Sequence, residues 1–362
     1  MITFDDVSFA YQGGIPDGSE PPALRHIHFH AERGECIVLC GKSGCGKTTM
    51  LRMVNGLVPN FYQGRLEGDI TVGNVHVKEA SLPQVAAVAG SVFQNPRTQF
   101  FHLDTTGEMA FNMENLNIPH DKMVERLKET AWKLDIQTLM DRDIFQLSGG
   151  EKQQIACGSV YASMPEVIVM DEPSSNLDME SIRKLQDLIR TMKDEGKTIL
   201  ISEHRLWYLE DIADRYVLLK DGQIENEFTS DEILALSLQE LEQSGLRAVR
   251  RKQLWNMGTR TIRQEKDMEK AAFLEIEGLR FSRQMRQVLD INRLAIPKGA
   301  IVAVIGENGA GKSTFALCLC GLLKHHGTVR INGERISNKK LPEQAYLVMQ
   351  EPGHQLFSDS VN

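Results

Sequence analysis

The sequence lacks any run of apolar residues that approaches the ~18–20 residues of a membrane-spanning helix. Its first residues, MITFDDVSFAYQGG, contain neither the basic segment nor the apolar segment of a signal peptide. Basic residues are also fewer than acidic ones, since the sequence has 41 Lys and Arg and 49 Asp and Glu. The resulting net charge of −8 argues against a broad nucleic-acid-binding surface. We therefore expect a cytoplasmic protein with no nucleic-acid partner.

Cysteine is scarce, and its spacing matches no common metal site. The six cysteines are Cys36, Cys40, Cys45, Cys157, Cys318 and Cys320. No Cys-x-x-Cys pair occurs, and no nearby histidine completes a tetrahedral zinc site with the first three. We expect buried, reduced thiols with a structural role. A redox role for Cys45, which lies in a loop, is the alternative.

An internal repeat is the most informative feature of the chain. The length of 362 residues is that of about two domains. The segment GKSGCGKTT at 41–49 returns as GENGAGKST at 306–314, and VFQNPRTQFF at 92–101 returns as VMQEPGHQLF at 348–357. A period this long exceeds that of a solenoid repeat. The sequence therefore predicts two copies of one α/β domain.

Both glycine-rich segments have the spacing of a P-loop, Gly-x-x-x-x-Gly-Lys followed by Thr or Ser. Each follows a short apolar stretch that we expect to be a strand, at 36–40 and 301–305, and each opens a helical pattern. The glycines would turn backbone N–H groups toward phosphates, with the lysines at the β- and γ-phosphates. The hydroxyl residues that follow the lysines, Thr48 and Ser313, would bind Mg²⁺. The predicted nucleotide-binding residues are Gly41, Ser43, Gly44, Gly46, Lys47, Thr48 and Thr49 in the first copy and Gly306, Asn308, Gly309, Gly311, Lys312, Ser313 and Thr314 in the second.

The first copy continues with groups suited to hydrolysis. The segment LSGGEKQ at 147–153 leads into a helical pattern at 153–163, and a later apolar stretch ends in Asp171 and Glu172. A carboxylate at a strand end fits the Mg²⁺-holding role for Asp171, and the next carboxylate fits a group that polarises the attacking water. His204 follows a further apolar stretch at 198–202, which we also expect to be a strand.

In order and spacing, these motifs resemble the nucleotide-binding domain of ATP-binding cassette (ABC) proteins. The matching positions are Lys47, Gln94, 147–153, 171–172, 174–178 and His204. The resemblance covers the first copy and the first third to half of the second. It implies an α/β, P-loop NTPase fold with a helical signature subdomain, plus a partial second copy. It also implies ATP and Mg²⁺ as ligands and ATP hydrolysis as the activity.

The same resemblance assigns roles to individual residues. It implies that Tyr11 stacks on adenine and that His204 is the switch histidine of a site whose catalytic carboxylate is Glu172. Gln94, with Gln350 as its counterpart in the second copy, would contact Mg²⁺ and couple the site to a membrane subunit. The γ-phosphate of a nucleotide held by a facing domain would be bound by Ser148, Gly149 and Gly150.

Three segments resemble a narrower group, the tandem ATPase of energy-coupling-factor (ECF) transporters. They are GLVPNFYQG at 56–64, QNPRTQFF at 94–101 and SEHRL at 202–206. This resemblance implies uptake of a vitamin or a transition metal ion, and a position on the inner face of the cell membrane. The implied partners are a transmembrane coupling protein and a substrate-binding membrane component. One or two of Phe100, Phe101 and Phe111 would line the groove for the membrane partner, the alternative being core packing.

We predict a complete first nucleotide-binding domain at 1–230, a charged helical linker at 231–271, and a partial second domain at 272–362, truncated after its glutamine loop. We expect the linker to be solvated, with one amphipathic helix; binding of anionic lipid by its basic run, 247–252, is a weaker alternative. In this family two domains pack head to tail, so neither site closes within one chain. A longer chain or another subunit is expected to supply the second domain. Symmetric pairing of two first copies and a decayed gene product are the alternatives.

Three positions depart from the family pattern, and two other functions stay open. Glu151 stands where glutamine is usual, Gln154 stands where arginine is common, and Arg283 occupies the second-copy position of Tyr11. The first alternative function is a soluble tandem ABC ATPase that acts without a membrane partner, like the translation-factor branch. The second is a truncated, non-catalytic nucleotide-binding module.

Overall fold

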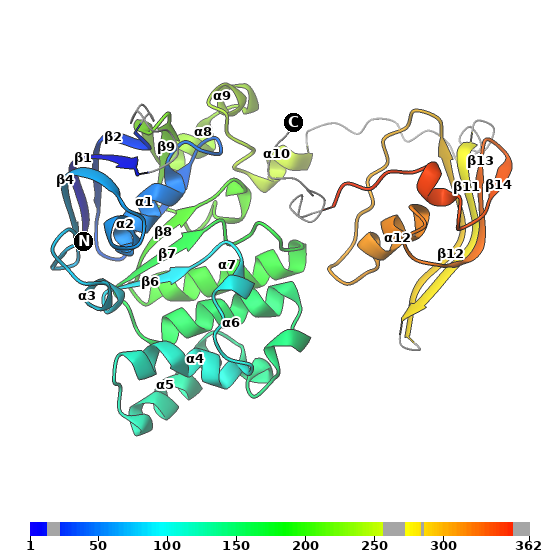
Figure 1. Cartoon of the computed structure of the whole chain (residues 1–362). Helices are drawn as coiled ribbons and strands as arrows, with labels where there is room; N and C mark the ends of the chain where they lie inside the picture. The colour runs from blue at the N-terminus through cyan, green and yellow to red at the C-terminus, as the bar shows by residue number, and fades with distance from the viewer. Residues whose placement is uncertain (13–21, 256–271, 284–285, 350–362) are drawn as a thin grey trace. The chain divides into compact units, whose positions relative to one another are not determined.

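The computed structural model describes residues 1–12, 22–255, 272–283 and 286–349. They belong to two compact units, Met1–Gly258 and Thr259–Asn362 (Figure 1). The predicted domain limits stay predictions, because residues 256–271 lie outside the described part.

The centre of unit 1 is a six-stranded sheet in the order β10-β9-β3-β8-β7-β6. All strands run parallel except β10, which is antiparallel to β9. The strands are β3 (Cys36–Cys40), β6 (Ala89–Val92), β7 (Val167–Asp171), β8 (Thr198–Ser202), β9 (Arg215–Lys220) and β10 (Gln223–Thr229). The strands predicted at 36–40 and 198–202 are therefore confirmed. Both faces of β3 are covered, which explains why all five of its residues are apolar.

Alternate side chains of β3 enter two different cores. Cys36, Val38 and Cys40 pack on the face covered by helices, whereas Ile37 and Leu39 pack on the opposite face. The second core also contains residues of a four-stranded antiparallel sheet, ordered β2-β1-β4-β5. Its strands are β1 (Ile2–Tyr11), β2 (Leu24–Ala31), β4 (Gly64–Val72) and β5 (Val75–His76). The two sheets thus enclose α1 (Lys47–Val54), the helix that opens at the P-loop.

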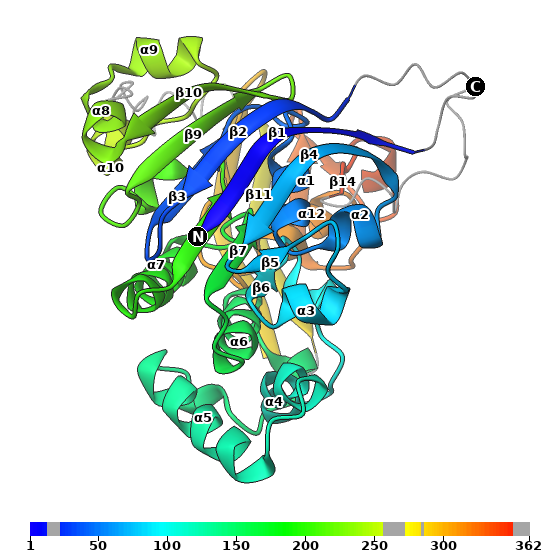
Figure 2. The same cartoon turned by 90° about the vertical axis from the view of Figure 1, so that its left-hand side faces the viewer.

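The helical subdomain predicted from the signature segment is present. α4 (Thr105–Asn115) and α5 (His120–Lys133) contact each other and α6 (Gly149–Ala162). Figure 2 shows α4 and α5 together at one end of unit 1. Unit 1 also contains α2 (Leu57–Asn60), α3 (Leu82–Ala86), α7 (Met179–Asp194) and the 3-10 turns η1 (Pro96–Thr98), η2 (Gln137–Leu139), η3 (Ile144–Gln146) and η4 (Leu206–Tyr208).

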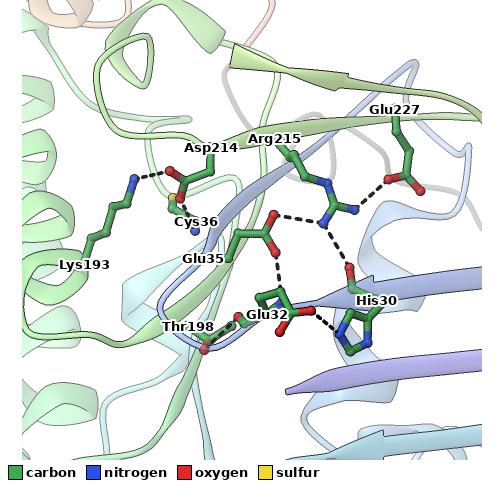
Figure 3. Close-up of polar contacts among 9 residues, drawn as sticks. All are labelled: His30, Glu32, Glu35, Cys36, Lys193, Thr198, Asp214, Arg215 and Glu227. Atoms are coloured by element: carbon green, nitrogen blue, oxygen red, sulfur yellow. Dashed lines mark hydrogen bonds and ion pairs between the residues drawn. The ribbon is translucent and has the colours of Figure 1, made fainter. Parts of the chain in front are cut away.

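A polar network joins the starts of β3 and β9 to the last residues of β2 and β10 (Figure 3). Arg215 on β9 donates to Glu35 at 2.9 Å, to Glu227 on β10 at 2.6 Å, and to the carbonyl of His30 on β2 at 3.1 Å. Glu35 also accepts the N–H of Glu32 at 2.9 Å. The network therefore connects β2, β3, β9 and β10 at the edge away from the P-loop.

The expectation of a solvated linker is wrong for residues 231–255. This stretch forms α8 (Ser230–Ala235), α9 (Leu238–Gln243) and α10 (Arg251–Trp255) instead of one amphipathic helix. Ile233, Leu241 and Val249 are fully buried in the core beneath the helices of unit 1. Its apolar residues are therefore part of the first domain's core, and most of its charged residues are exposed on the outer face.

Unit 2 repeats the antiparallel sheet of unit 1. Its order, β12-β11-β13-β14, corresponds strand for strand to β2-β1-β4-β5. The elements are β11 (Ala272–Arg283), β12 (Arg286–Pro297), β13 (His326–Ile331), β14 (Glu334–Ile336), α12 (Lys312–Leu319) and η5 (Leu341–Glu343). The repeat found in the sequence is thus also a repeat of fold in this part.

The predicted strand at 301–305 does not form. The segment has no regular structure, and Ile301 and Ile305 are 101% and 89% exposed. Within 272–283 and 286–349, no parallel strand is present to bond with it. Because a central parallel strand depends on partners on both sides, the apolar sequence alone does not produce one.

Candidate nucleotide-binding and hydrolysis site

The P-loop of unit 1 joins β3 to α1 through glycines that no other residue can replace without strain. Gly41 has φ 131° and Gly46 has φ 110°. A Cβ at Gly41 would lie 2.2 Å from the carbonyl oxygen of Leu219, and one at Gly46 would lie 2.6 Å from a methyl of Leu24. The loop shape is therefore fixed by local sterics, and α1 begins at Lys47, immediately after the glycine.

The two P-loop lysines are held in the same way. Lys47 Nζ donates to the carbonyls of Gly41 and Lys42, each at 2.9 Å. Lys312 Nζ donates to the carbonyls of Gly306 and Glu307 at 2.8 and 2.6 Å. The corresponding glycines of the second loop also have positive φ. Both ammonium groups therefore lie against the loop that would surround phosphates, and their contact with phosphate stays a prediction.

A pocket of about 240 Å³ lies beside Thr48, the residue that follows the P-loop lysine. Thr48, Gln94 and Asp171 all line it. The Thr48 hydroxyl donates to Asp171 at 3.2 Å, and the Ser202 hydroxyl also donates to that carboxylate. Hydroxyl, amide and carboxylate oxygens fit a cation that takes its other ligands from water and substrate phosphates. No cluster of three or more His, Cys, Asp or Glu occurs in the described residues, so no all-protein metal cage competes with this pocket.

The three residues predicted to be catalytic meet at one carboxylate. Gln94 Nε2 donates to Glu172 at 3.0 Å, and His204 Nε2 lies 3.2 Å from the other oxygen of the same group. Glu172 has a φ of 43°, a conformation rare outside glycine, and its N–H donates to the carbonyl of Ser202 at 3.0 Å. Asp171 and Ser202, the last residues of β7 and β8, are paired in the sheet. The loop that follows β7 and the loop that follows β8 therefore begin side by side. The sheet therefore assembles the predicted site.

The signature segment forms the start of α6. Ser148 is its N-cap residue and makes a capping box with Glu151, because Glu151 accepts the Ser148 N–H at 2.7 Å. Glu151 also pairs with Arg142 at 3.0 Å. Burial raises the pKa of Glu151, but the hydrogen bonds from Ser148 and the ion pair with Arg142 outweigh it, so the pKa is lowered. The departure from glutamine at this position thus supplies a stronger cap for the helix that presents Ser148, Gly149 and Gly150.

Other predicted residues are placed less directly. The Tyr11 hydroxyl lies 3.0 Å from Thr49 Oγ1, and its ring meets those of Phe9 and Tyr62 edge to face. Tyr11 is thus next to the P-loop, and adenine stacking stays a prediction. Arg283, at the end of β11, is exposed. Gln350 lies outside the described residues.

The structure adds residues that the sequence reading missed. Ser202 contacts Asp171, and Tyr62 lines the pocket while its ring lies under the guanidinium of Arg52 at 4.1 Å. Ser202 lies two residues before the predicted histidine, and this position could have indicated that it belongs to the site. For Tyr62, the sequence offers no such indication beyond its place in the segment 56–64.

The expectation of reduced structural thiols is confirmed. All six cysteines are free and buried. Burial raises the pKa of Cys36, Cys40 and Cys157 to about 12. These thiols are therefore poor nucleophiles near neutral pH.

Comparison with known proteins agrees with this geometry. The family model described as ABC transporter matches residues 24–175 and 289–361. A putative ABC transporter ATP-binding protein of Treponema denticola is 40% identical over 366 residues, covering 100% of this chain and 73% of that protein. The chain belongs to the ABC transporter family. As an ATP-binding protein of that family, it is a P-loop ATPase, and ABC ATPase subunits work with transmembrane components.

Two further relatives give context for this ABC protein. A putative HMP/thiamine import ATP-binding protein of Bacillus subtilis, YkoD, is 29% identical over 100% of the chain and 70% of its own length. The structure of cbiO1 from Clostridium perfringens, part of the ABC transporter complex cbiONQ, matches with a TM-score of 0.58 and 24% identity. That match covers 67% of this chain and 94% of cbiO1, and it shows the ABC ATPase fold. Among the described residues, no helix is long and apolar enough to cross a membrane.

Proposed function

We propose that this ABC protein is the ATP-binding and hydrolysing subunit of an importer of the energy-coupling-factor type. It would drive uptake of a vitamin or a transition metal ion through a separate membrane subunit. The names of two relatives support the proposal, since one is an HMP/thiamine import protein and the other is part of cbiONQ. The observation that carries it is an apolar groove next to Gln94.

The groove has a volume of about 590 Å³ and opens between α3, α4 and the loop that follows β6. Phe93, Phe101 and Phe111 line it, and Phe101 is 73% exposed and stacks on Phe111 at 4.9 Å. Glu108 accepts the N–H groups of Phe101 and His102 at 2.8 and 2.9 Å, so the loop is fixed in this shape. Exposed aromatic side chains in a preformed groove suit an amphipathic helix of a partner.

The residues around Glu172 would perform hydrolysis. When bound, MgATP supplies the phosphoanhydride bond whose cleavage drives the cycle. Lys47 would hold the phosphates, Thr48 and Asp171 would bind the cation, and Glu172 would polarise a water. Gln94 contacts Glu172 and belongs to the same loop as the groove, so it would pass a change at the site to the membrane partner.

Closure of the site needs a facing domain that presents a signature segment such as 148–150. A longer chain or another subunit would supply it. The two P-loops with matching lysine contacts support this arrangement, because each would bind one nucleotide between domains. The alternative with no membrane partner does not itself account for the groove beside Gln94.

Uptake assays in proteoliposomes test the proposal. The chain would be co-reconstituted with its membrane subunits, and ATP would be supplied on the side of the membrane that carries the chain. Uptake of labelled vitamins and of Co²⁺ or Ni²⁺ would then be measured. Phe101→Ser should lower ATP-driven uptake at least about tenfold while ATP binding stays unchanged. Trp132→Ser is the matched control, because Trp132 is also 73% exposed but lies on α5, outside the groove. Equal uptake by both variants, or sedimentation of the chain with ribosomes in place of membranes, would refute the proposal.

A further inference from the structure

A buried carboxyl group joins the two loops that carry the predicted hydrolysis residues. The first loop follows β7 and opens with Glu172; the second follows β8 and contains His204. Between β8 and His204 stands Glu203, which is 2% exposed. A glutamate so deeply buried requires partners for both of its oxygens.

Four donors surround Glu203. Its Oε1 accepts the N–H of Ser174 at 3.1 Å and the hydroxyl of Tyr208 at 3.0 Å. Its Oε2 accepts the N–H of His204 at 2.7 Å and the N–H of Arg205 at 3.0 Å. Burial and the adjacent Glu203 carboxyl raise the pKa of Tyr208 well above its usual value, so the phenol stays a donor. The group acts as an acceptor in all four contacts, which is the behaviour of a carboxylate.

Arg205 also joins the loop that follows β8 to the loop that follows β7. Its guanidinium donates to the carbonyl of Ser174 and to the carbonyl of Leu177, each at 3.2 Å. The N–H and the C=O of Ser174, a fully buried residue, are therefore both held by side chains from the other loop. Those side chains come from the residues on either side of His204.

We propose that Glu203 and Arg205 are positioning residues that keep His204 at hydrogen-bond distance from Glu172. We call the contacts of Glu203 and Arg205 with the two loops the clamp. Ser174 is two residues beyond Glu172, so the contacts with Ser174 fix the loop that carries Glu172. The hydrogen bond from the His204 N–H to Glu203 fixes the loop that carries His204, which keeps the side chains of His204 and Glu172 at 3.2 Å. The inference rests on the hydrolytic roles proposed above for Glu172 and His204.

Steady-state ATP hydrolysis by the full chain with its membrane partners tests the clamp. In Glu203→Gln, an amide N–H₂ replaces one acceptor oxygen and faces two donors, so one side of the side chain loses its hydrogen bonds and the loops are held less firmly. We expect kcat to fall about 10- to 100-fold and KM for ATP to stay within about twofold, because the P-loop is untouched. A role in folding alone would lower the midpoint of thermal unfolding without this split between kcat and KM.

Glu35→Gln is the matched control. Glu35 also binds a backbone N–H and an arginine, but it belongs to the network at the opposite edge of the sheet. We expect it to lower the unfolding midpoint and to leave kcat unchanged, with all rates measured well below each midpoint. Equal losses of kcat in Glu203→Gln and Glu35→Gln, or a Glu203→Gln kcat within twofold of the wild type, would overturn the proposal.

Arg205→Met supplies a second measurement if Glu203→Gln does not fold. Arg205 is only half-buried, and its loss frees the carbonyls of Ser174 and Leu177. We expect a fall in kcat of at least about tenfold, with partial rescue in Arg205→Lys, which keeps one donor group. A normal kcat in Arg205→Met, measured alongside an inactive Glu172→Gln, would reject the clamp and leave the proposed function standing. A normal rate in Glu172→Gln would instead reject the hydrolytic roles on which the clamp depends.

Discussion

Replacing Glu172 by glutamine isolates the chemical step from nucleotide binding. The side chain accepts a hydrogen bond from Gln94 at 3.0 Å and lies 3.2 Å from His204 Nε2. Glutamine has the same shape and keeps one acceptor oxygen, but it is no base. The lysine and hydroxyl contacts of the P-loop do not involve position 172, so ATP binding should be preserved.

The expected loss follows from the role of a general base. Such a group contributes about 10²- to 10⁴-fold to a rate, which corresponds to roughly 3–5 kcal/mol in the barrier. The cost in folding stability should be far smaller, about 1 kcal/mol, because one hydrogen bond of a partly exposed side chain is weakened. Turnover should therefore almost vanish in a protein that still folds and binds ATP.

Phosphate release by the full chain with its partners measures this, and a fluorescent ATP analogue measures affinity. Glu180→Gln is the control, since Glu180 lies in the first turn of α7 and pairs with Lys184 on the surface. We expect control turnover to equal the wild type and Glu172→Gln to accumulate bound ATP. A Glu172→Gln rate within a few-fold of the wild type would show that another group activates the water.

Three other predictions concern stability and reactivity. Leu241→Ala should lower the free energy of unfolding of unit 1 by about 2–5 kcal/mol in urea titrations, because the side chain is fully buried; a surface-like cost below about 0.5 kcal/mol would contradict the core assignment. The folded-state pKa of Glu151 lies below its ordinary value of 4.5, so its contribution to stability is present above pH 4.5 and is lost as the pH falls through the folded-state pKa. The stability gap between the wild type and Glu151→Gln should accordingly narrow on acidification, and a constant gap would disprove the ionic contribution. Finally, iodoacetamide at pH 8 should leave Cys36, Cys40 and Cys157 unlabelled until urea is added, which peptide mass spectrometry would check.

Local constraints made some parts of the site predictable from the sequence. The glycines of the P-loop are required by positive φ angles and close contacts within a few residues, so their spacing alone identifies the loop. The helix after the signature was predicted at 153–163 but begins at Gly149, and the missed signal was the Ser148–Glu151 capping box, which is also local.

Other features depend on distant contacts and left no readable pattern. The many charged residues of 231–255 predicted a solvated linker, whereas Ile233 and Val249 become core residues because the helices of unit 1 offer an apolar surface. Glu203 directly precedes the predicted histidine, and no sequence pattern marked it as buried. Its burial and its contact with Ser174 arise from the pairing of β7 with β8, which the sequence of either strand does not reveal.

Comparison of the stretches 36–40 and 301–305 shows which features of this chain depend on nearby residues and which depend on neighbouring strands. Both are apolar and both precede a P-loop, yet β3 is fully buried between β8 and β9, whereas Ile301 and Ile305 stay exposed. Each such aliphatic side chain forgoes roughly 1.5–3 kcal/mol by remaining in water, so the strand forms only where neighbours are present to cover it. The second P-loop nevertheless keeps its glycine angles and its lysine contacts. The conformation of the P-loop can therefore form without the parallel sheet, while the meeting of Asp171, Glu172 and His204 requires two adjacent parallel strands.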